Sequence, residues 1–220
     1  MSQANARRHM LDSQLATNSV HSESVLAALD IVEREKFVPE GNKKTAYVDD
    51  DIIAEEGSLI LSPIVFGRML EVAKIKPKDV VLDIGCSTGY SSSVLSYLCK
   101  KVVAVESTTK LVAAARSNIE KQGIENVTVI RNDLAKGGSA TAHYDKIFIN
   151  GQVEFVPEVI LDQLKPNGKL ITVMRVNEEG ATPFIVTLSL DKKHVLSLQT
   201  HFQANATILS DFVHKKSFKF

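Results

Sequence analysis

The sequence predicts an α/β fold with a doubly wound, mostly parallel sheet, an antiparallel C-terminal edge and an N-terminal helical extension. From residue 79 onward, short apolar runs alternate with segments of helical periodicity, which is the pattern of strand–helix–strand units. The chain has 220 residues, 44% of them hydrophobic and 24% charged, and these values suit one globular domain with a sizeable core. We therefore expect a single domain over residues 1–220, with the extension in residues 1–75 and the sheet in residues 76–220.

The composition of the chain argues against nucleic acids and membranes as partners. The chain has 26 Lys and Arg against 26 Asp and Glu, so it lacks the excess of positive charge that binding to a nucleic-acid backbone requires. No apolar run approaches the roughly 20 residues of a membrane span, and the first residues contain no apolar signal-peptide segment. We expect a cytoplasmic protein with no nucleic-acid and no membrane partner. The sequence leaves its oligomeric state open.

The cysteines and histidines indicate neither a disulfide framework nor a metal site. Cys86 and Cys99 are the two cysteines, and in a chain without an export signal we expect both as reduced thiols. The six histidines are scattered, without the spacing of paired metal ligands. We therefore expect no metal.

Two helices are expected in the first 75 residues, with a loop and a short strand in residues 40–60 between them. Ser22 can cap the first helix, whose apolar residues recur at helical spacing: Val25, Leu26, Leu29 and Val32. Ser62 and Pro63 open the second helix as its N-cap and first residue, and Lys76-Pro77 ends it.

The rest of the chain alternates between strands and helices. Strands are expected at residues 80–84, 102–105, 127–130, 144–149 and 170–174. Helices are expected on Val94, Leu95 and Leu98, on Leu111, Ala115 and Ile119 with Gly123 at the end, and over Val159 to Leu164 before the turn at 166–168. Two further strands, 184–190 and 194–202, joined by a tight turn at 191–193, form the antiparallel edge.

The turn after the first of these strands has the features of a ligand-binding site. Residues 80–90 read Val-Val-Leu-Asp-Ile-Gly-Cys-Ser-Thr-Gly-Tyr. Glycines at the carboxyl end of a parallel strand let a ligand lie against the backbone, and the next helix offers free N–H groups. The spacing of Gly85 and Gly89 matches neither a dinucleotide fingerprint nor a P-loop. Asp83 would repel a pyrophosphate and suits a cationic or hydrogen-bond-donating ligand.

Two more carboxylates end the next strands. Glu106 follows Gly85 at about the ~20-residue offset at which an acidic residue binds ribose hydroxyls in doubly wound folds. Asp133 comes just after the third strand. Three carboxylates along one sheet edge predict a nucleoside pocket without phosphates.

These residues resemble the motif of the Rossmann-like class I S-adenosyl-L-methionine-dependent methyltransferases, with Ser87 at the usual middle glycine. The resemblance implies S-adenosyl-L-methionine as cofactor and S-adenosyl-L-homocysteine as product. It implies that Asp83, Gly85 and Gly89 border the methionine moiety, Glu106 the ribose, and Asp133 with Leu134 the adenine. The neighbouring residues complete the expected cofactor site: Cys86, Ser87, Tyr90 and Ser107.

Other segments are similar to the protein-L-isoaspartate O-methyltransferase family over most of residues 8–175. They include Arg34-Glu35-x-Phe37-Val38-Pro39, Ala46-Tyr47-x-Asp49, Val156-Pro157 and the segment from Gln163 to Gly168. The resemblance implies methylation of carboxyl groups on isoaspartyl residues in damaged proteins or peptides. It also assigns residues 1–75 to the acceptor side and residues 76–220 to the cofactor-binding core. A carboxylate is ionised at pH 7 and needs no general base.

The sequence departs from this family in the acceptor segment. The family usually reads Gly-x-Thr-Ile-Ser-x-Pro there, with the serine beside the acceptor carboxyl, but Leu59 and Leu61 replace the threonine and the serine. Ser62 is the candidate to replace that serine, and an N-cap is its other interpretation. After the fourth strand, where the family usually has a pair of small alanines, this sequence has Asn150-Gly151. Two alternatives therefore stay open: a methyltransferase with another acceptor, and a non-catalytic module that binds the cofactor.

Overall fold

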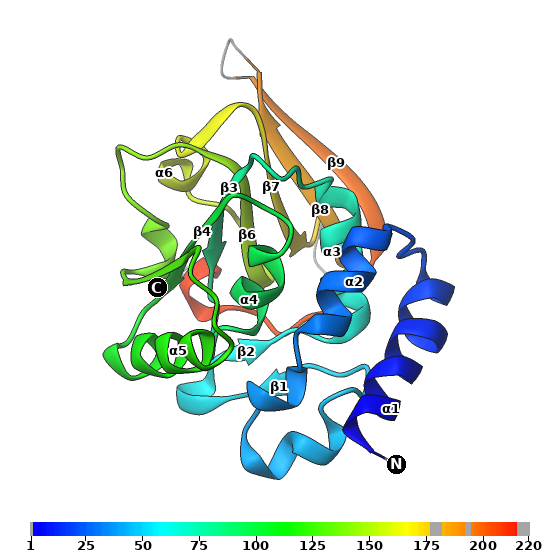
Figure 1. The fold of residues 1–220 in the computed structure, drawn as a ribbon. Coiled ribbons are helices and arrows are strands. Elements are labelled where there is room, and N and C mark those ends of the chain that lie inside the picture. Colours follow the sequence, from blue (N-terminus) through cyan, green and yellow to red (C-terminus); the bar gives the residue numbers. More distant parts are fainter. Residues whose placement is uncertain (1, 177–181, 192–194, 215–220) are drawn as a thin grey trace, which may run out of the picture.

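A seven-stranded sheet forms the centre of the computed structural model, which describes residues 2–176, 182–191 and 195–214 (Figure 1). Its strands are β3 (Val80–Ile84), β4 (Lys101–Glu106), β5 (Val127–Arg131), β6 (Tyr144–Val153), β7 (Leu164–Met174), β8 (Phe184–Leu190) and β9 (Leu196–Gln203). They lie in the order β5-β4-β3-β6-β7-β8-β9. The first five are parallel, whereas β8 and β9 are antiparallel. The predicted α/β class and its antiparallel C-terminal edge are therefore confirmed.

Helices cover both faces of the sheet because alternate residues of each strand point to opposite sides. On one face, Val81, Phe148 and Ile171 pack in a cluster with the N-terminal helices and α4 (Tyr90–Ser96). α5 (Thr109–Lys121) packs on the same side at the β4–β5 end. On the other face, Leu82 and Ile147 pack with α6 (Glu158–Leu161) and the short 3-10 turn η6 (Leu134–Lys136).

The N-terminal extension consists of helices and a small hairpin beside the sheet. It contains α1 (Gln3–His9), a π-helical turn η1 (Met10–Leu15), α2 (Glu23–Ile31), α3 (Pro63–Ala73) and four 3-10 turns, η2 (Ala16–Asn18), η3 (Arg34–Lys36), η4 (Glu40–Thr45) and η5 (Glu55–Gly57). β1 (Ile52–Ile53) and β2 (Leu59–Ile60) form a separate antiparallel pair, which confirms a short strand between the helices. Figure 1 shows α1, α2 and α3 on the same side of the molecule, where α3 packs against β7 and β8.

Two predicted helices end earlier than expected. α4 stops at Ser96, and Leu98 lies beyond its end. The Asn126 side-chain amide donates hydrogen bonds to the carbonyl oxygens of Ser96 and Cys99, which therefore need no partners from a longer helix. α6 stops at Leu161, and Leu164 already belongs to β7, where it pairs with Tyr144. Backbone pairing with β6 therefore ends that helix.

Other differences lie at the two ends of the chain. No helix was predicted before residue 22, yet the structure has α1 and η1 there, and η1 buries Met10, Leu11 and Leu15. Ser22 is the N-cap residue of α2 as predicted, but its hydroxyl bonds to Ser24 and caps no backbone N–H. A 3-10 turn, η7 (Ser210–Phe212), which was not predicted, follows β9. Most of the predicted turn at 191–193, and His194, lie outside the described residues.

Candidate functional site

The turn from Gly85 to Gly89 joins β3 to α4 through three residues with positive φ. These are Gly85 at 73°, Ser87 at 53° and Gly89 at 97°. A Cβ on Gly85 would meet nothing within 4 Å, whereas one on Gly89 would lie 3.1 Å from Ile119 and 3.3 Å from the Ala115 carbonyl oxygen. Gly85 therefore leaves open space at the end of β3, and Gly89 lets α5 approach. Ser87 holds the left-handed conformation that glycine adopts without steric cost.

Asp83 is fully buried at the end of β3 and joins three elements. Its Oδ2 accepts hydrogen bonds from Ser92 and, at 2.7 Å, from Ser91, and its Oδ1 accepts one from Asn150 Nδ2 at 2.6 Å. Burial raises the pKa of Asp83. Through these bonds the Asp83 carboxylate connects the end of β3 to α4 and to β6. Asp83 lines neither of the two cavities described next. The three partners were not predicted, although two of them are serines in the first turn of α4.

Two cavities adjoin the predicted site, and the larger of these two lies at the carboxyl ends of β3 and β4 with a volume of about 220 Å³. Four of the predicted cofactor residues line it: Gly85, Glu106, Ser107 and Leu134. Glu106 is only 2% exposed and accepts hydrogen bonds from the N–H groups of Ser87 at 2.5 Å and Ser107 at 3.1 Å. Burial raises its pKa to about 7. These four predicted cofactor residues therefore lie around the same cavity.

Two segments that the sequence did not predict cover this cavity. The first is residues 56–59. Two hydrogen bonds hold it in place: one between the hydroxyl groups of Ser58 and Ser87, with 2.7 Å between the oxygens, and one from the Thr108 hydroxyl to the Glu56 carboxylate. The second, residues 207–211, follows β9 and is held by the Thr207 N–H, which donates to Asp51 at 2.8 Å. These contacts connect residues far apart in sequence, so no local pattern indicates them.

The smaller cavity, of about 10 Å³, adjoins the acceptor segment. Its walls include Cys86 and Tyr90 of the predicted cofactor set, together with Leu59, Ile60, Leu61, Phe66, Ser91 and Asn150. Leu59 borders both cavities. The acceptor segment is therefore placed beside the glycine turn, and its walls are mainly apolar.

Two predicted residues, Asp133 and Ser62, have other contacts. Asp133 caps η6, accepting a hydrogen bond from the Ala135 N–H at 3.0 Å, and lines neither cavity. Ser62 is the N-cap of α3, where its hydroxyl accepts a hydrogen bond from the Val65 N–H at 3.4 Å. The Leu61 carbonyl accepts a hydrogen bond from the buried Arg34 at 2.8 Å. The N-cap interpretation thus accounts for the position of the Ser62 side chain.

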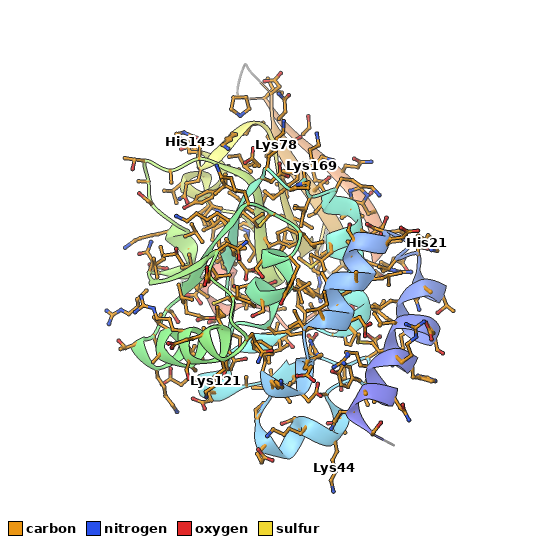
Figure 2. All side chains as sticks on the ribbon, viewed as in Figure 1. His21, Lys44, Lys78, Lys121, His143 and Lys169 are labelled. Carbon is orange, nitrogen blue, oxygen red and sulfur yellow. The ribbon has the colours of Figure 1, made fainter. Side chains whose placement is uncertain are left out.

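Other kinds of site find no support in the described ranges. They contain no group of three or more His, Cys, Asp or Glu side chains that could hold a metal ion, and none of their helices is long and apolar enough to cross a membrane. The labelled histidine and lysine side chains in Figure 2 lie around the periphery instead of in one patch: His21, Lys44, Lys78, Lys121, His143 and Lys169.

Sequence comparison identifies close relatives of the chain. The sequence model of the family described as protein-L-isoaspartate(D-aspartate) O-methyltransferase matches residues 5–201. A protein-L-isoaspartate O-methyltransferase of Opitutus terrae is 33% identical over 196 residues, covering 88% of this chain and 83% of that protein. One from Koribacter versatilis is 34% identical over 165 residues, covering 75% of this chain and 74% of that protein.

Solved structures share the fold. A structure titled protein-L-isoaspartate O-methyltransferase superposes with a TM-score of 0.79 at 24% identity and covers 95% of this chain and 66% of that one. A beta-aspartate methyltransferase (PCMT) from Plasmodium falciparum in complex with S-adenosyl-L-homocysteine gives a TM-score of 0.77 at 19% identity, with 96% and 99% coverage. These likenesses support the Rossmann-like fold.

Proposed function

Because this chain belongs to the protein-L-isoaspartate(D-aspartate) O-methyltransferase family, we propose that it transfers a methyl group from S-adenosyl-L-methionine to the carboxylate of L-isoaspartyl residues in proteins or peptides. One observation supports this most directly: the open Cβ position of Gly85 and the buried Glu106 carboxylate face the same cavity at the carboxyl end of the parallel sheet. Ligands of doubly wound folds bind in that place.

The residues around the larger cavity fit a nucleoside cofactor. Glu106 supplies acceptor oxygens for ribose hydroxyls, Leu134 and Leu111 an apolar surface for a base, and Gly85 room for close approach. None of the residues that the structure places around this cavity is a lysine or arginine, which suits a cationic, phosphate-free ligand. Its volume of about 220 Å³ is below the ~300–1,000 Å³ of common ligand sites. We therefore expect residues 56–59 and 207–211 to shift outward when the cofactor enters.

The chain's own residues contribute positioning and exclusion of water. When bound, S-adenosyl-L-methionine supplies an electrophilic methyl group on a positively charged sulfur. The acceptor carboxylate is already ionised at pH 7, so no side chain has to remove a proton. The covering segments and the apolar residues Leu59 and Leu61 keep water from the place where nucleophile and methyl meet.

The acceptor segment favours a second candidate, a methyltransferase of the same fold with a different acceptor. Leu59 and Leu61 are 5% and 3% exposed, and neither side chain can bond a carboxylate. The Ser62 hydroxyl, the remaining candidate here, caps α3. Burying an acceptor charge against leucine is costly.

A methyl-transfer assay with two peptides that differ only in isoaspartate or aspartate tests the proposal, with calorimetry of cofactor binding on the same preparation. Methylation confined to the isoaspartyl peptide supports it. The variant Leu61→Ser should then raise kcat/KM for that peptide about tenfold, since a hydroxyl can donate to the carboxylate, and leave the cofactor Kd unchanged. Cofactor binding with methylation of another acceptor selects the second candidate. Binding without any methyl transfer selects a non-catalytic module.

The cytoplasmic location also remains part of the proposal. Cys86 and Cys99 are both buried free thiols. Reduced cysteines are typical of proteins in a reducing compartment.

A further inference from the structure

Asn150, which lies within β6 beside the end of β3, has a side-chain carbonyl oxygen with no hydrogen-bond partner among the described residues. The residue is 3% exposed, and its Nδ2 donates to Asp83 Oδ1 at 2.6 Å, to the Ile84 carbonyl at 3.2 Å and to the Ser91 hydroxyl at 3.3 Å. A flipped amide would set its oxygen against the Asp83 carboxylate, so the orientation is fixed. In the described part of the chain, the Asn150 Oδ1 accepts no hydrogen bond. A buried acceptor left unpaired is costly, which points to a donor supplied from outside the chain.

The surroundings of Asn150 indicate how large that donor is. Asn150 lines the smaller cavity, between Cys86 of the glycine turn and Leu61 of the acceptor segment. A volume of about 10 Å³ accommodates one group the size of a water molecule or an ammonium. A peptide unit or a carboxylate does not fit there. Leu59 lies in the walls of both this space and the cofactor cavity, so the two spaces are neighbours.

The charges near the cavity indicate what kind of donor fits. Asp83 bonds directly to Asn150, and Glu106 lies close enough that both carboxylates, after burial itself, raise the pKa of the Cys86 thiol. No lysine or arginine lines the cavity; the buried Arg34 guanidinium lies behind two of its walls, bonded to the Leu61 carbonyl and 4.9 Å from the Tyr90 ring centroid. A small space whose lining holds no cation, and whose Asn150 is bonded to the Asp83 carboxylate, suits a cationic N–H donor better than a neutral one.

We propose that the carbonyl oxygen of Asn150 binds the α-ammonium group of S-adenosyl-L-methionine. This inference rests on the proposed function, since it takes the cofactor as given. It adds a binding residue outside the glycine motif, at a position where the family usually has a small residue. The other N–H source, the backbone amide of the acceptor peptide, is disfavoured by the size of the cavity.

Calorimetry with two ligands tests the assignment: S-adenosyl-L-homocysteine and its analogue without the α-amino group. Asn150→Ala should weaken binding of S-adenosyl-L-homocysteine by about 10- to 100-fold, the usual effect of a hydrogen bond to a charged group. It should change binding of the analogue far less. Asn150→Ser, which keeps a hydroxyl for Asp83, should behave in the same way and serves if the alanine variant fails to fold. Ser92→Ala is the matched control, because it removes a bond to Asp83 but keeps the Asn150 oxygen. It should affect both ligands equally.

Several results would overturn the inference. Equal weakening of both ligands by Asn150→Ala would mean that Asn150 acts only through Asp83. No change in either would mean that the cavity holds a water only. A raised KM for the acceptor peptide with an unchanged cofactor Kd would assign the oxygen to the acceptor. If the unaltered protein binds neither ligand, the proposed function itself fails, and this outcome is distinct from the others.

Discussion

The two glycines of the turn after β3 have different neighbours, and substitution should separate their roles. Gly89→Ala places a methyl group 3.1 Å from Ile119 at a φ of 97°, so we expect a loss of about 2–4 kcal/mol in the free energy of unfolding. Gly85→Ala meets no atom within 4 Å and should cost about 1–2 kcal/mol, yet its methyl group enters the cofactor cavity. Urea unfolding and calorimetry of S-adenosyl-L-homocysteine binding check both. A Gly85→Ala protein with unchanged affinity would contradict this view of the cavity.

Glu106 should make stability depend on pH. Burial raises the pKa of its carboxyl from 4.5 to about 7. Below pH 4.5 the group is protonated in the folded and unfolded chains alike, and its stabilising contribution is complete. Between 4.5 and about 7 only the unfolded chain ionises, so this contribution, on the order of 3 kcal/mol, is lost as pH rises. Glu106→Gln should lack this loss. Urea unfolding from pH 4.5 to 7.5 measures the difference, with exposed Glu120→Gln as control, and equal slopes for wild type and Glu106→Gln would refute it.

At the scale of elements, the segment after β9 completes the site. Phe212 is fully buried with Leu134 and Val153 in the cluster under η6, and it anchors residues 207–211, which line the cavity. Phe212→Ala should lower the free energy of unfolding by about 3–5 kcal/mol and weaken S-adenosyl-L-homocysteine binding about tenfold or more, because the segment must be ordered upon binding. Leu198→Ala on the exposed face of β9, where the residue is 40% exposed, is the control and should change neither. If Phe212→Ala binds S-adenosyl-L-homocysteine as tightly as the wild type, residues 207–211 do not contribute to the binding site.

The elements that sequence predicted well are those with a local cause. The apolar runs of β3 and β4 and the Ser62–Pro63 start of α3 are set by neighbouring residues, so they could be predicted. The covers of the cavity could not, because they depend on distant pairs: Asp51 with Thr207, 156 positions apart, and Glu56 with Thr108, 52 apart. The end of α6 also depends on tertiary pairing with β6.

The same distinction divides the residues of the site. Gly85 and Glu106 follow from strand ends, and they meet at the cavity because parallel strands end at one edge. Asp133 was expected at this edge by the same argument, but its carboxylate satisfies the free N–H group at the start of η6. Asn150 was visible in sequence only as a departure from the family. Its orphaned oxygen requires the three-dimensional contacts with Asp83 and Ser91.

At the scale of the whole molecule, one apolar cluster joins the N-terminal extension to the sheet. Met10, Leu29 and Phe66 of the extension pack in it with Phe148 and Ile171 of the central strands. The extension cannot bury these side chains without the sheet, and the sheet would expose one face without the extension. The two parts therefore should not unfold independently, in keeping with the prediction of a single domain.

Calorimetric unfolding should accordingly show one transition whose calorimetric and van't Hoff enthalpies agree. S-adenosyl-L-homocysteine at 100 times its Kd should stabilise the folded state by about 2.7 kcal/mol, which corresponds to a rise in Tm of about 5–10 °C for a chain of this length. The whole transition should shift, because the cavity is walled by the extension, the sheet and the segment after β9 at once. Two transitions, with only the later one moved by the ligand, would show that residues 1–75 fold apart from the cofactor-binding core.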